Sequence, residues 1–330
     1  MKMRNIAANV LSILIVLGIV LVGVIGVAKD QIAAEGPATE PVRFSVERGA
    51  RFDAVAENLA EAGAVDNLML FRLAGRYTGK ANQLKFGEYE IAARSSMQDI
   101  LDLLVKGGNV NYQITIPPGM TVAMALDRIA AQDPLRGEIT EIPPEGSLFP
   151  DTWAYRRGGD RQEVLDRMQT RMDEVLEEVW QGRSRNSPLE NKEQLLILAS
   201  IIEKETKPEE HRKVASVFVN RLNKGMRLQT DPTVIYGITL GRETLGRGLR
   251  RSELAAPTPY NTYVIQGLPP TPICNPSRES LEAAANPDET PYLYFVADGT
   301  GGHAFAETLE QHNRNVAVWR RIERERKANE

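Results

Sequence analysis

The chain has 330 residues, which is long enough for two modest domains. Its 42% hydrophobic and 25% charged residues are ordinary for a globular protein, and a net charge of -4 gives no basic footprint for nucleic acid. The single cysteine, Cys274, excludes an internal disulfide framework and a cysteine-rich metal site. The three histidines, His211, His303 and His312, are too scattered to match a zinc motif. Any catalysis should therefore depend on carboxylates, hydroxyls and amides, without a metal or other cofactor.

The N-terminal region contains an almost continuous apolar run at residues 10–28. Together with residues 6–8, this run has the roughly 20 residues that are needed to cross a bilayer. It is too long for a typical signal-peptide core, and no clear small-x-small cleavage site follows it directly. Lys2 and Arg4 precede it, so the positive-inside rule places the N-terminus in the cytoplasm. We predict that residues 1–30 are a cytoplasmic tip and a single-pass anchor in the inner membrane, with a periplasmic remainder. A cleaved signal peptide is the alternative.

A linker and a small domain are expected next. Residues 31–41 are rich in Ala, Gly, Pro and Glu, which is typical of a linker. Residues 42–108 should form a compact domain. Its expected elements are a strand at 44–46, helices at 53–62 and 67–77, a strand at 86–91, and a helix from Ser96 to residue 104. The strand–helix–helix–strand order resembles a LysM domain, a small module that binds glycan chains, although many small domains share this order.

Residues 109–330 are expected to form a larger, mixed α/β domain, so that the fold class of the chain is α+β. Clean alternation of polar and apolar residues predicts a strand at 110–116. The other expected elements are helices at 122–131, 161–180, 194–206, 209–223 and 278–286, a strand at 292–296, and a basic helix at the C-terminus. Between them, residues 257–276 form a long loop that carries aromatic residues and amides, and loops of this kind are usually functional or disordered.

The helix at residues 194–206 carries the main candidate for catalysis. Leu196, Ala199 and Glu203 are spaced to lie on one face, so that a carboxylate ends an apolar face. Glu205 lies about 200° around the helix from Glu203 and is expected to point toward water. Glu203 is either a helix-end residue that pairs with a lysine or a general acid whose pKa is raised by an apolar wall. The helix alone does not distinguish these two possibilities.

Several ordered sequence blocks extend from this helix almost to the C-terminus. They are Leu198-Ala-Ser-Ile-Ile-Glu-Lys-Glu-Thr206, Val214-Ala-Ser-Val-Phe-Val-Asn-Arg-Leu222, Met226-Arg-Leu-Gln-Thr-Asp-Pro-Thr-Val-Ile-Tyr236, Tyr260-Asn-Thr-Tyr263, Gly267-Leu-Pro-Pro270, Tyr292-Leu-Tyr-Phe-Val-Ala-Asp298 and Gly301-Gly-His303. In these blocks the chain resembles the MltG (YceG-like) family of endolytic murein transglycosylases. The resemblance spans the whole chain and is least clear at residues 237–251.

The resemblance implies a role for several of these residues. It implies that Glu203 is the catalytic acid of a peptidoglycan-cleaving lyase, and that Glu205 is structural or an ion-pair partner. It also implies a set of substrate contacts, namely Asn220, Gln229, Thr230, Asp231, Asn261 and Thr262. Two of these have a structural alternative, because Asn220 could satisfy a loop carbonyl and Asp231 could be the cap before Pro232.

The reaction that the resemblance implies is cleavage of the bond between N-acetylmuramic acid and N-acetylglucosamine in nascent strands. It leaves 1,6-anhydro ends and terminates strand elongation. One carboxyl group suffices, because the C6 hydroxyl of the same sugar is an intramolecular nucleophile. The implied partners are glycan strands, the inner membrane and peptidoglycan synthases of the elongation machinery, without nucleic acid. Two alternatives are a glycan-binding scaffold without chemistry and a lysozyme-type hydrolase, which would need a second carboxylate such as Asp231.

Overall fold

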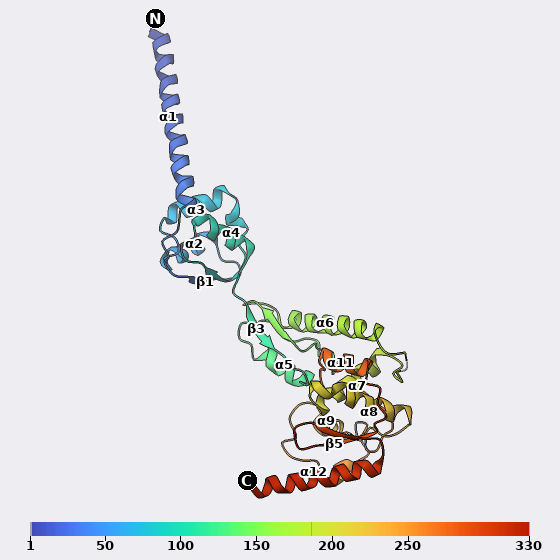
Figure 1. Ribbon diagram of the computed structural model, residues 1–330. Helices are drawn as coiled ribbons and strands as arrows, with labels where there is room; N and C mark the ends of the chain where they lie inside the picture. Colours follow the sequence, from blue (N-terminus) through green and yellow to red (C-terminus); the bar gives the residue numbers. More distant parts are fainter. Residues whose placement is uncertain (1, 186, 330) are drawn as a thin grey trace. The chain divides into compact units, whose positions relative to one another are not determined.

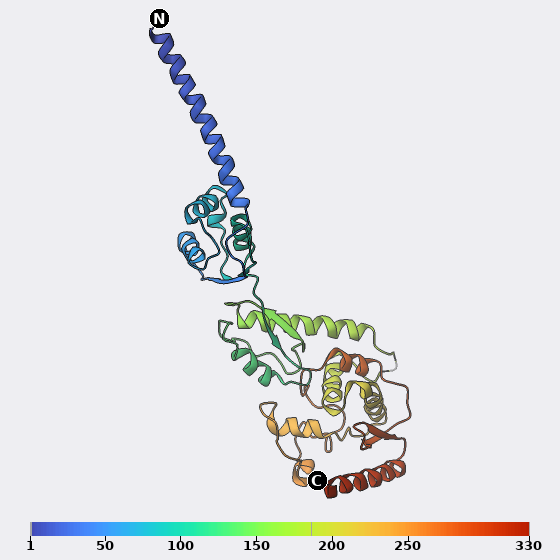
Figure 2. The ribbon, with the colours of Figure 1, turned by 60° about the vertical axis from the view of Figure 1, so that its left-hand side comes forward.

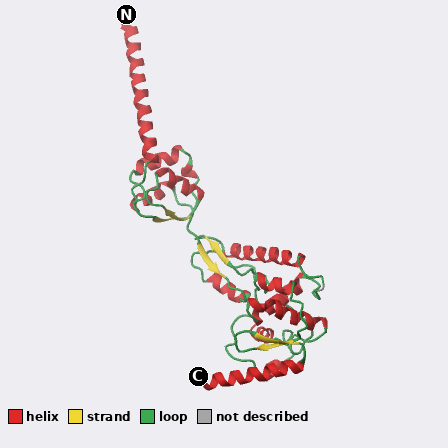
Figure 3. Ribbon diagram, viewed as in Figure 1, coloured by secondary structure: helices red, strands yellow, loops and turns green. Residues whose placement is uncertain are grey.

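The computed structural model describes residues 2–185 and 187–329, and these form two compact units. Unit 1 comprises Met1–Tyr112 with Arg156–Gly158, and unit 2 comprises Gln113–Tyr155 with Gly159–Glu330. Both units are mainly helical, and each has small two-stranded pairings between its helices (Figure 1, Figure 3). Each unit has a hydrophobic core of its own.

Unit 1 begins with the long helix α1 (Lys2–Ala33). Its side chains at residues 13–27 are exposed, and Ile13–Ala33 is long and apolar enough to cross a membrane, as the sequence predicts. The helix continues beyond the apolar run, and Ala28 and Ile32 in its last turns pack against the core of unit 1. Residues 34–41, which are expected to be a linker, are hydrogen-bonded to the same unit. In particular, the Arg94 amide donates to the carbonyl of Ala38 over 2.7 Å.

The rest of unit 1 has the predicted strand–helix–helix–strand order. Its elements are β1 (Val42–Val46), α2 (Phe52–Glu61), α3 (Leu68–Tyr77), η1 (Lys80–Asn82), β2 (Gly87–Ile91) and α4 (Met97–Lys106). The two strands pair antiparallel, with Phe44 opposite Tyr89. Ser96 caps α4, because its hydroxyl accepts the Asp99 amide while the Asp99 carboxylate accepts the Ser96 amide, each over 3.1 Å. The likeness of this unit to a LysM domain stays a prediction.

Unit 2 contains the remaining elements. They are β3 (Tyr112–Thr115), α5 (Val122–Ala130), β4 (Thr152–Tyr155), α6 (Arg161–Gln181), α7 (Lys192–Glu205), η2 (Pro208–Glu210), α8 (His211–Asn223), α9 (Asp231–Thr239), α10 (Arg251–Ala255), α11 (Arg278–Ala285), β5 (Tyr294–Ala297), β6 (His303–Ala306) and α12 (Leu309–Asn329). The strands pair as β3 with β4 and as β5 with β6. The sequence analysis did not predict β4, β6, α9 or α10. These elements have four to nine residues, too few to show a clear hydrophobic period.

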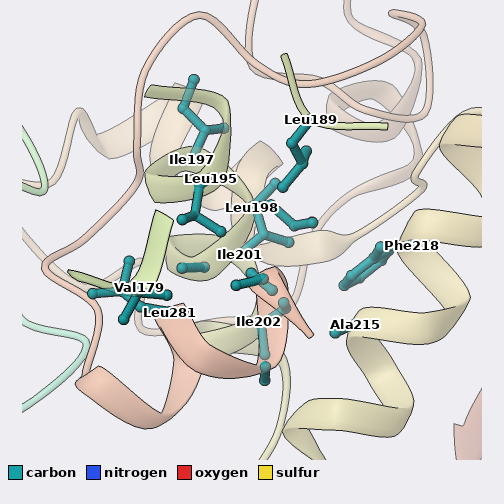
Figure 4. Close-up of a cluster of buried hydrophobic side chains, with 14 of the residues drawn as sticks. Val179, Leu189, Leu195, Ile197, Leu198, Ile201, Ile202, Ala215, Phe218 and Leu281 are labelled. Carbon is teal, nitrogen blue, oxygen red and sulfur yellow. The ribbon is translucent and has the colours of Figure 1, made fainter. Parts of the chain in front are cut away.

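Helix α7 is the centre of the core of unit 2. Leu195 and all residues from 197 to 202 are buried, and α6, α8, α9 and α11 all contact this helix. Figure 4 shows Leu198, Ile201 and Ile202 of α7 in one cluster with residues of the neighbouring helices, among them Phe218 and Leu281. A helix that is apolar on all sides is buried on all sides. The single apolar face that the sequence suggests is therefore incomplete, and Glu203 and Glu205 follow directly after this buried segment.

Candidate active site

Glu203 is fixed to the start of α11. Its Oε2 accepts hydrogen bonds from the Ser277 amide (2.9 Å), the Ser277 hydroxyl (2.5 Å) and the Ser280 hydroxyl (2.6 Å). Ser277 is the N-cap of α11, so the carboxylate also lies at the positive end of the helix dipole. The expectation of an apolar wall around this carboxylate is wrong. The chain brings polar donors to it from a helix that is more than 70 residues away in the sequence.

The Glu203 contacts continue into a buried network that joins three helices. The Ser280 hydroxyl lies 3.2 Å from Nδ1 of His211, and Nε2 of the same histidine lies 3.2 Å from the carbonyl oxygen of Thr206. Ser280 is 0% exposed and His211 is 2% exposed. These groups lie inside the protein and satisfy one another's hydrogen-bonding capacity. The polar contacts of Glu203 therefore form a junction between α7, α8 and α11.

Glu205, the last residue of α7, has a different environment. The Thr230 hydroxyl donates a hydrogen bond to its Oε2. Burial raises the pKa of Glu205, the hydrogen bond from Thr230 opposes that rise, and the negative charge of Asp231 adds to it. The expectation that Glu205 points toward water is wrong, because α9 contacts α7 and its N-cap residue, Thr230, lies against the Glu205 carboxyl group. Glu205 is thus the carboxyl group at the end of α7 whose pKa is raised by burial.

A cluster of three buried hydroxyl groups holds Thr230 in place. The Thr230 amide donates to Oγ1 of Thr262 over 3.0 Å, and the Thr262 and Thr233 hydroxyls lie 2.9 Å apart. All three threonines are at most 2% exposed. Two loops that are distant in the sequence are therefore joined directly beside Glu205. Of the predicted substrate contacts, Thr230 and Thr262 lie here as buried, supporting groups.

Gln229 and Asp231, on either side of Thr230, are the exposed members of the predicted set. Gln229 has a positive φ of 51°, which is uncommon for a residue other than glycine, and its amide donates to the Thr262 carbonyl over 3.1 Å. Asp231 begins α9, and its Oδ1 accepts a hydrogen bond from the Tyr263 hydroxyl over 2.7 Å. Strained backbone often marks a functional site. These two side chains are therefore available to a ligand that approaches Glu205.

The two asparagines of the predicted set are used within the fold. The Asn220 side chain donates to the carbonyls of Thr290 (2.7 Å) and Tyr292 (3.0 Å), which is the structural alternative foreseen for this residue. Asn261 is 0% exposed, and its amide nitrogen donates to three carbonyls at residues 253, 254 and 256. Both asparagines therefore stabilise loops.

The sequence-based set omits His303, although it lies in one of the quoted blocks. Its Nδ1 is 2.7 Å from Oε2 of Glu210, and its amide donates to Oε1 of the same residue over 2.9 Å. In its protonated form His303 would act together with Arg221 to lower the pKa of Glu205. A single histidine beside glycines gives no signal of this in the sequence. Within residues 2–185 and 187–329, no three His, Cys, Asp or Glu side chains are grouped to hold a metal.

Comparison with known proteins gives one family. The curated relatives include the endolytic murein transglycosylase of Bacillus subtilis, 28% identical over 83% of each chain. A second relative of that name, from Streptococcus pneumoniae, is 29% identical over 84% of this chain, which spans 58% of that longer protein. A solved YceG-like protein from Listeria monocytogenes is 28% identical, with a TM-score of 0.54 over 83% of this chain and 98% of its own. The YceG-like family itself matches residues 44–318, and the chain therefore belongs to the YceG-like family.

Proposed function

We propose that this chain is a membrane-anchored endolytic lytic transglycosylase that cleaves peptidoglycan between N-acetylmuramic acid and N-acetylglucosamine. The name of the curated relatives supports the reaction class. The observation that carries the proposal is the carboxyl group of Glu205, whose pKa is raised by burial beside two exposed polar side chains. A carboxylic acid that keeps its proton near neutral pH is what protonation of a glycosidic oxygen requires.

We infer that Glu205, rather than Glu203, is the general acid. Oε2 of Glu203 accepts hydrogen bonds from three donors at the junction with α11, whereas among the described residues Glu205 accepts a hydrogen bond from Thr230 alone. Glu205 also lies next to the loop that presents Gln229 and Asp231. The sequence alone favours Glu203, which remains the alternative, and paired variants decide between them.

The mechanism needs one carboxyl group in two states. Glu205 gives its proton to the oxygen that links the two sugars, and the bond from C1 of N-acetylmuramic acid to that oxygen breaks with oxocarbenium character. The Glu205 carboxylate then accepts the proton of the C6 hydroxyl of the same sugar. The C6 oxygen closes on C1, which gives a 1,6-anhydro end and consumes no water. Because the nucleophile is part of the substrate, proximity replaces a second protein group.

A hydrolase is the second candidate, and one observation favours it. The charge of Asp231 acts on Glu205, so a second carboxylate lies near the acid. A pair of carboxyl groups is the usual equipment of a hydrolase that uses water. The Asp231 carboxylate already accepts a hydrogen bond from the Tyr263 hydroxyl. We therefore propose that Asp231 positions neighbouring groups and takes no part in a reaction step. Reducing ends in the product would identify a hydrolase, and 1,6-anhydro ends would exclude it.

The first prediction compares two glutamates on one helix. Glu205→Gln keeps the shape of the side chain but removes the proton, so cleavage of purified glycan strands should fall by at least about 10²–10⁴-fold. Glu203→Gln keeps an oxygen acceptor for Ser277 and Ser280 and should retain most of the activity. Mass spectrometry of the products provides both the rate and the type of end.

The control for this comparison is stability. Glu203→Ala leaves buried donors without an acceptor, and each such loss costs about 1–3 kcal/mol, so its melting temperature should fall. Glu205→Gln should melt no lower than the parent chain at neutral pH, because a neutral amide is easier to bury than a carboxylate. If Glu203→Gln is inactive but fully folded while Glu205→Gln is active, the assignment returns to Glu203.

The second prediction uses opposite shifts of the pH profile. Activity needs the protonated acid and should therefore fall as pH rises through the pKa of Glu205. The Thr230 hydroxyl lowers that pKa and the Asp231 charge raises it. Thr230→Val should move the alkaline limit of activity to higher pH, with a rate about ten- to a hundredfold lower from the lost hydrogen bond. Asp231→Asn should move the limit to lower pH. Shifts in the same direction, or none, would show that Glu205 does not set the profile.

We further propose that α1 anchors the chain in the inner membrane, with its N-terminus in the cytoplasm and both units in the periplasm. The exposed, apolar residues 13–27 and the preceding Lys2 and Arg4 support this. In this position the enzyme would meet nascent strands and terminate their elongation beside the peptidoglycan synthases. The third prediction is that the intact chain stays in the membrane pellet after carbonate washing. A shortened chain in the soluble fraction would indicate a cleaved signal peptide.

The fourth prediction concerns residues 42–108, which we propose bind glycan chains in the manner of a LysM domain. Their strand–helix–helix–strand order and separate core support this role. Deleting them should reduce activity on intact sacculi more than activity on short soluble fragments, because only the long substrate reaches a second binding module. Equal losses on both substrates would show that the module supports the fold instead.

A further inference from the structure

Helix α3 carries an apolar stripe that faces away from its own core. Met69, Leu73 and Tyr77 are spaced four residues apart, which places them along one face of the helix. They are 84%, 62% and 86% exposed. The opposite face holds the buried Phe71 and Gly75, so the stripe is additional to the side that packs in unit 1. Three large apolar side chains with this exposure on a helix of 10 residues mark a contact surface.

The stripe belongs to the helix that packs at the base of α1. Helix α3 contacts α1, and Ala28 and Ile32 of α1 pack against the cluster that contains Phe71 (Figure 1, Figure 2). The continuous run of exposed apolar residues reaches Val27, which is 60% exposed, one residue before this packing begins at Ala28. If α1 crosses the bilayer, as proposed above, the bilayer surface lies at the level where α3 meets α1.

We propose that the Met69–Leu73–Tyr77 stripe inserts into the interface of the bilayer and holds unit 1 against the membrane surface. A helix with apolar residues on one side and arginines beside them is suited to lie in this interface. Arg76, whose side chain is 62% exposed, lies between Leu73 and Tyr77 in the sequence and can reach anionic head groups while it contacts Asp53. Tyrosine favours the same depth, because its ring is apolar and its hydroxyl is polar.

The size of the stripe favours lipid over a second protein. A stable protein interface buries about 800 Å² on each partner, which is 20–30 residues a side. Three side chains are too few for this. A helix that is already tethered to the membrane needs a far smaller contact area, because α1 holds it there and no association in three dimensions is required. The helix that carries the stripe also contacts α1, whose residues 13–27 face lipid under the proposed topology.

The test places a fluorescent probe on the stripe of the full-length chain. Cys274 is buried and 0% exposed, so an added cysteine is the site that a thiol reagent reaches. Met69→Cys and Leu73→Cys carry a nitrobenzoxadiazole probe, and Ser45→Cys on β1 is the matched control. Ser45 is exposed in the same unit, and β1 lies at the opposite end of the unit from α1 in both views (Figure 1, Figure 2). Each labelled chain is reconstituted in phosphatidylcholine–phosphatidylglycerol vesicles and purified by flotation.

The expected result is several-fold brighter, blue-shifted emission at positions 69 and 73 than at position 45, with quenching by brominated lipids. Flotation with water-like emission that aqueous iodide quenches at all three positions would overturn the proposal. Emission that falls when the protein is diluted in lipid would also overturn it, in favour of a second copy. Failure to float would overturn both the anchor and this contact. The inference rests on the proposed anchor and is independent of the proposed reaction. If lipid quenches the probe but the chain does not cleave glycan strands, only the transglycosylase assignment is contradicted.

Discussion

The burial of α7 on every side is the constraint on which the site depends. Neighbouring helices surround it, and its apolar residues from Leu195 to Ile202 form the centre of the core. Each fully buried leucine or isoleucine contributes about 1.5–3 kcal/mol, so the position of this helix is strongly determined. Its last turn carries two glutamates, and neither can turn to bulk water without losing contacts inside the protein. The two side chains meet different neighbours, and this difference separates their chemistry.

Glu203 and Glu205 show how two carboxyl groups on one helix obtain different roles. Glu203 accepts three donors at the start of α11, where the helix dipole favours a negative charge. Glu205 has a buried position and a second negative charge nearby, and these raise its pKa against the opposing effect of its hydroxyl donor. A carboxyl group whose pKa is raised by its environment is typical of acid–base sites. The proposal that Glu205 is the general acid therefore rests on the surroundings of its carboxyl group, because its position on the helix alone does not indicate this role.

The sequence predicts most helices of the chain well, because their apolar periods and caps are strong. Met168 and Met172 are buried on α6 at helical spacing, and Ser96, where a helix is predicted to begin, caps α4. The direction of Glu205 could not be predicted, because a helical wheel does not show that α9 will cover the side opposite Glu203. The same limit applies to Asn261. An amide in a loop gives no sign of whether it will bind a ligand or three carbonyls of its own chain.

The position of Glu205 depends on loops as well as on α7. Thr230 reaches Glu205 because its amide is held by Thr262, a residue from the long loop at 257–276. The turn before it requires the positive φ of Gln229, whose amide is held by the carbonyl of the same Thr262. One threonine thus fixes two successive residues of the other loop, and through them it fixes the hydroxyl that contacts Glu205. Glu205, Thr230 and Thr262 lie in three different sequence blocks. The surroundings of the helix end are therefore set by segments that a single motif does not include.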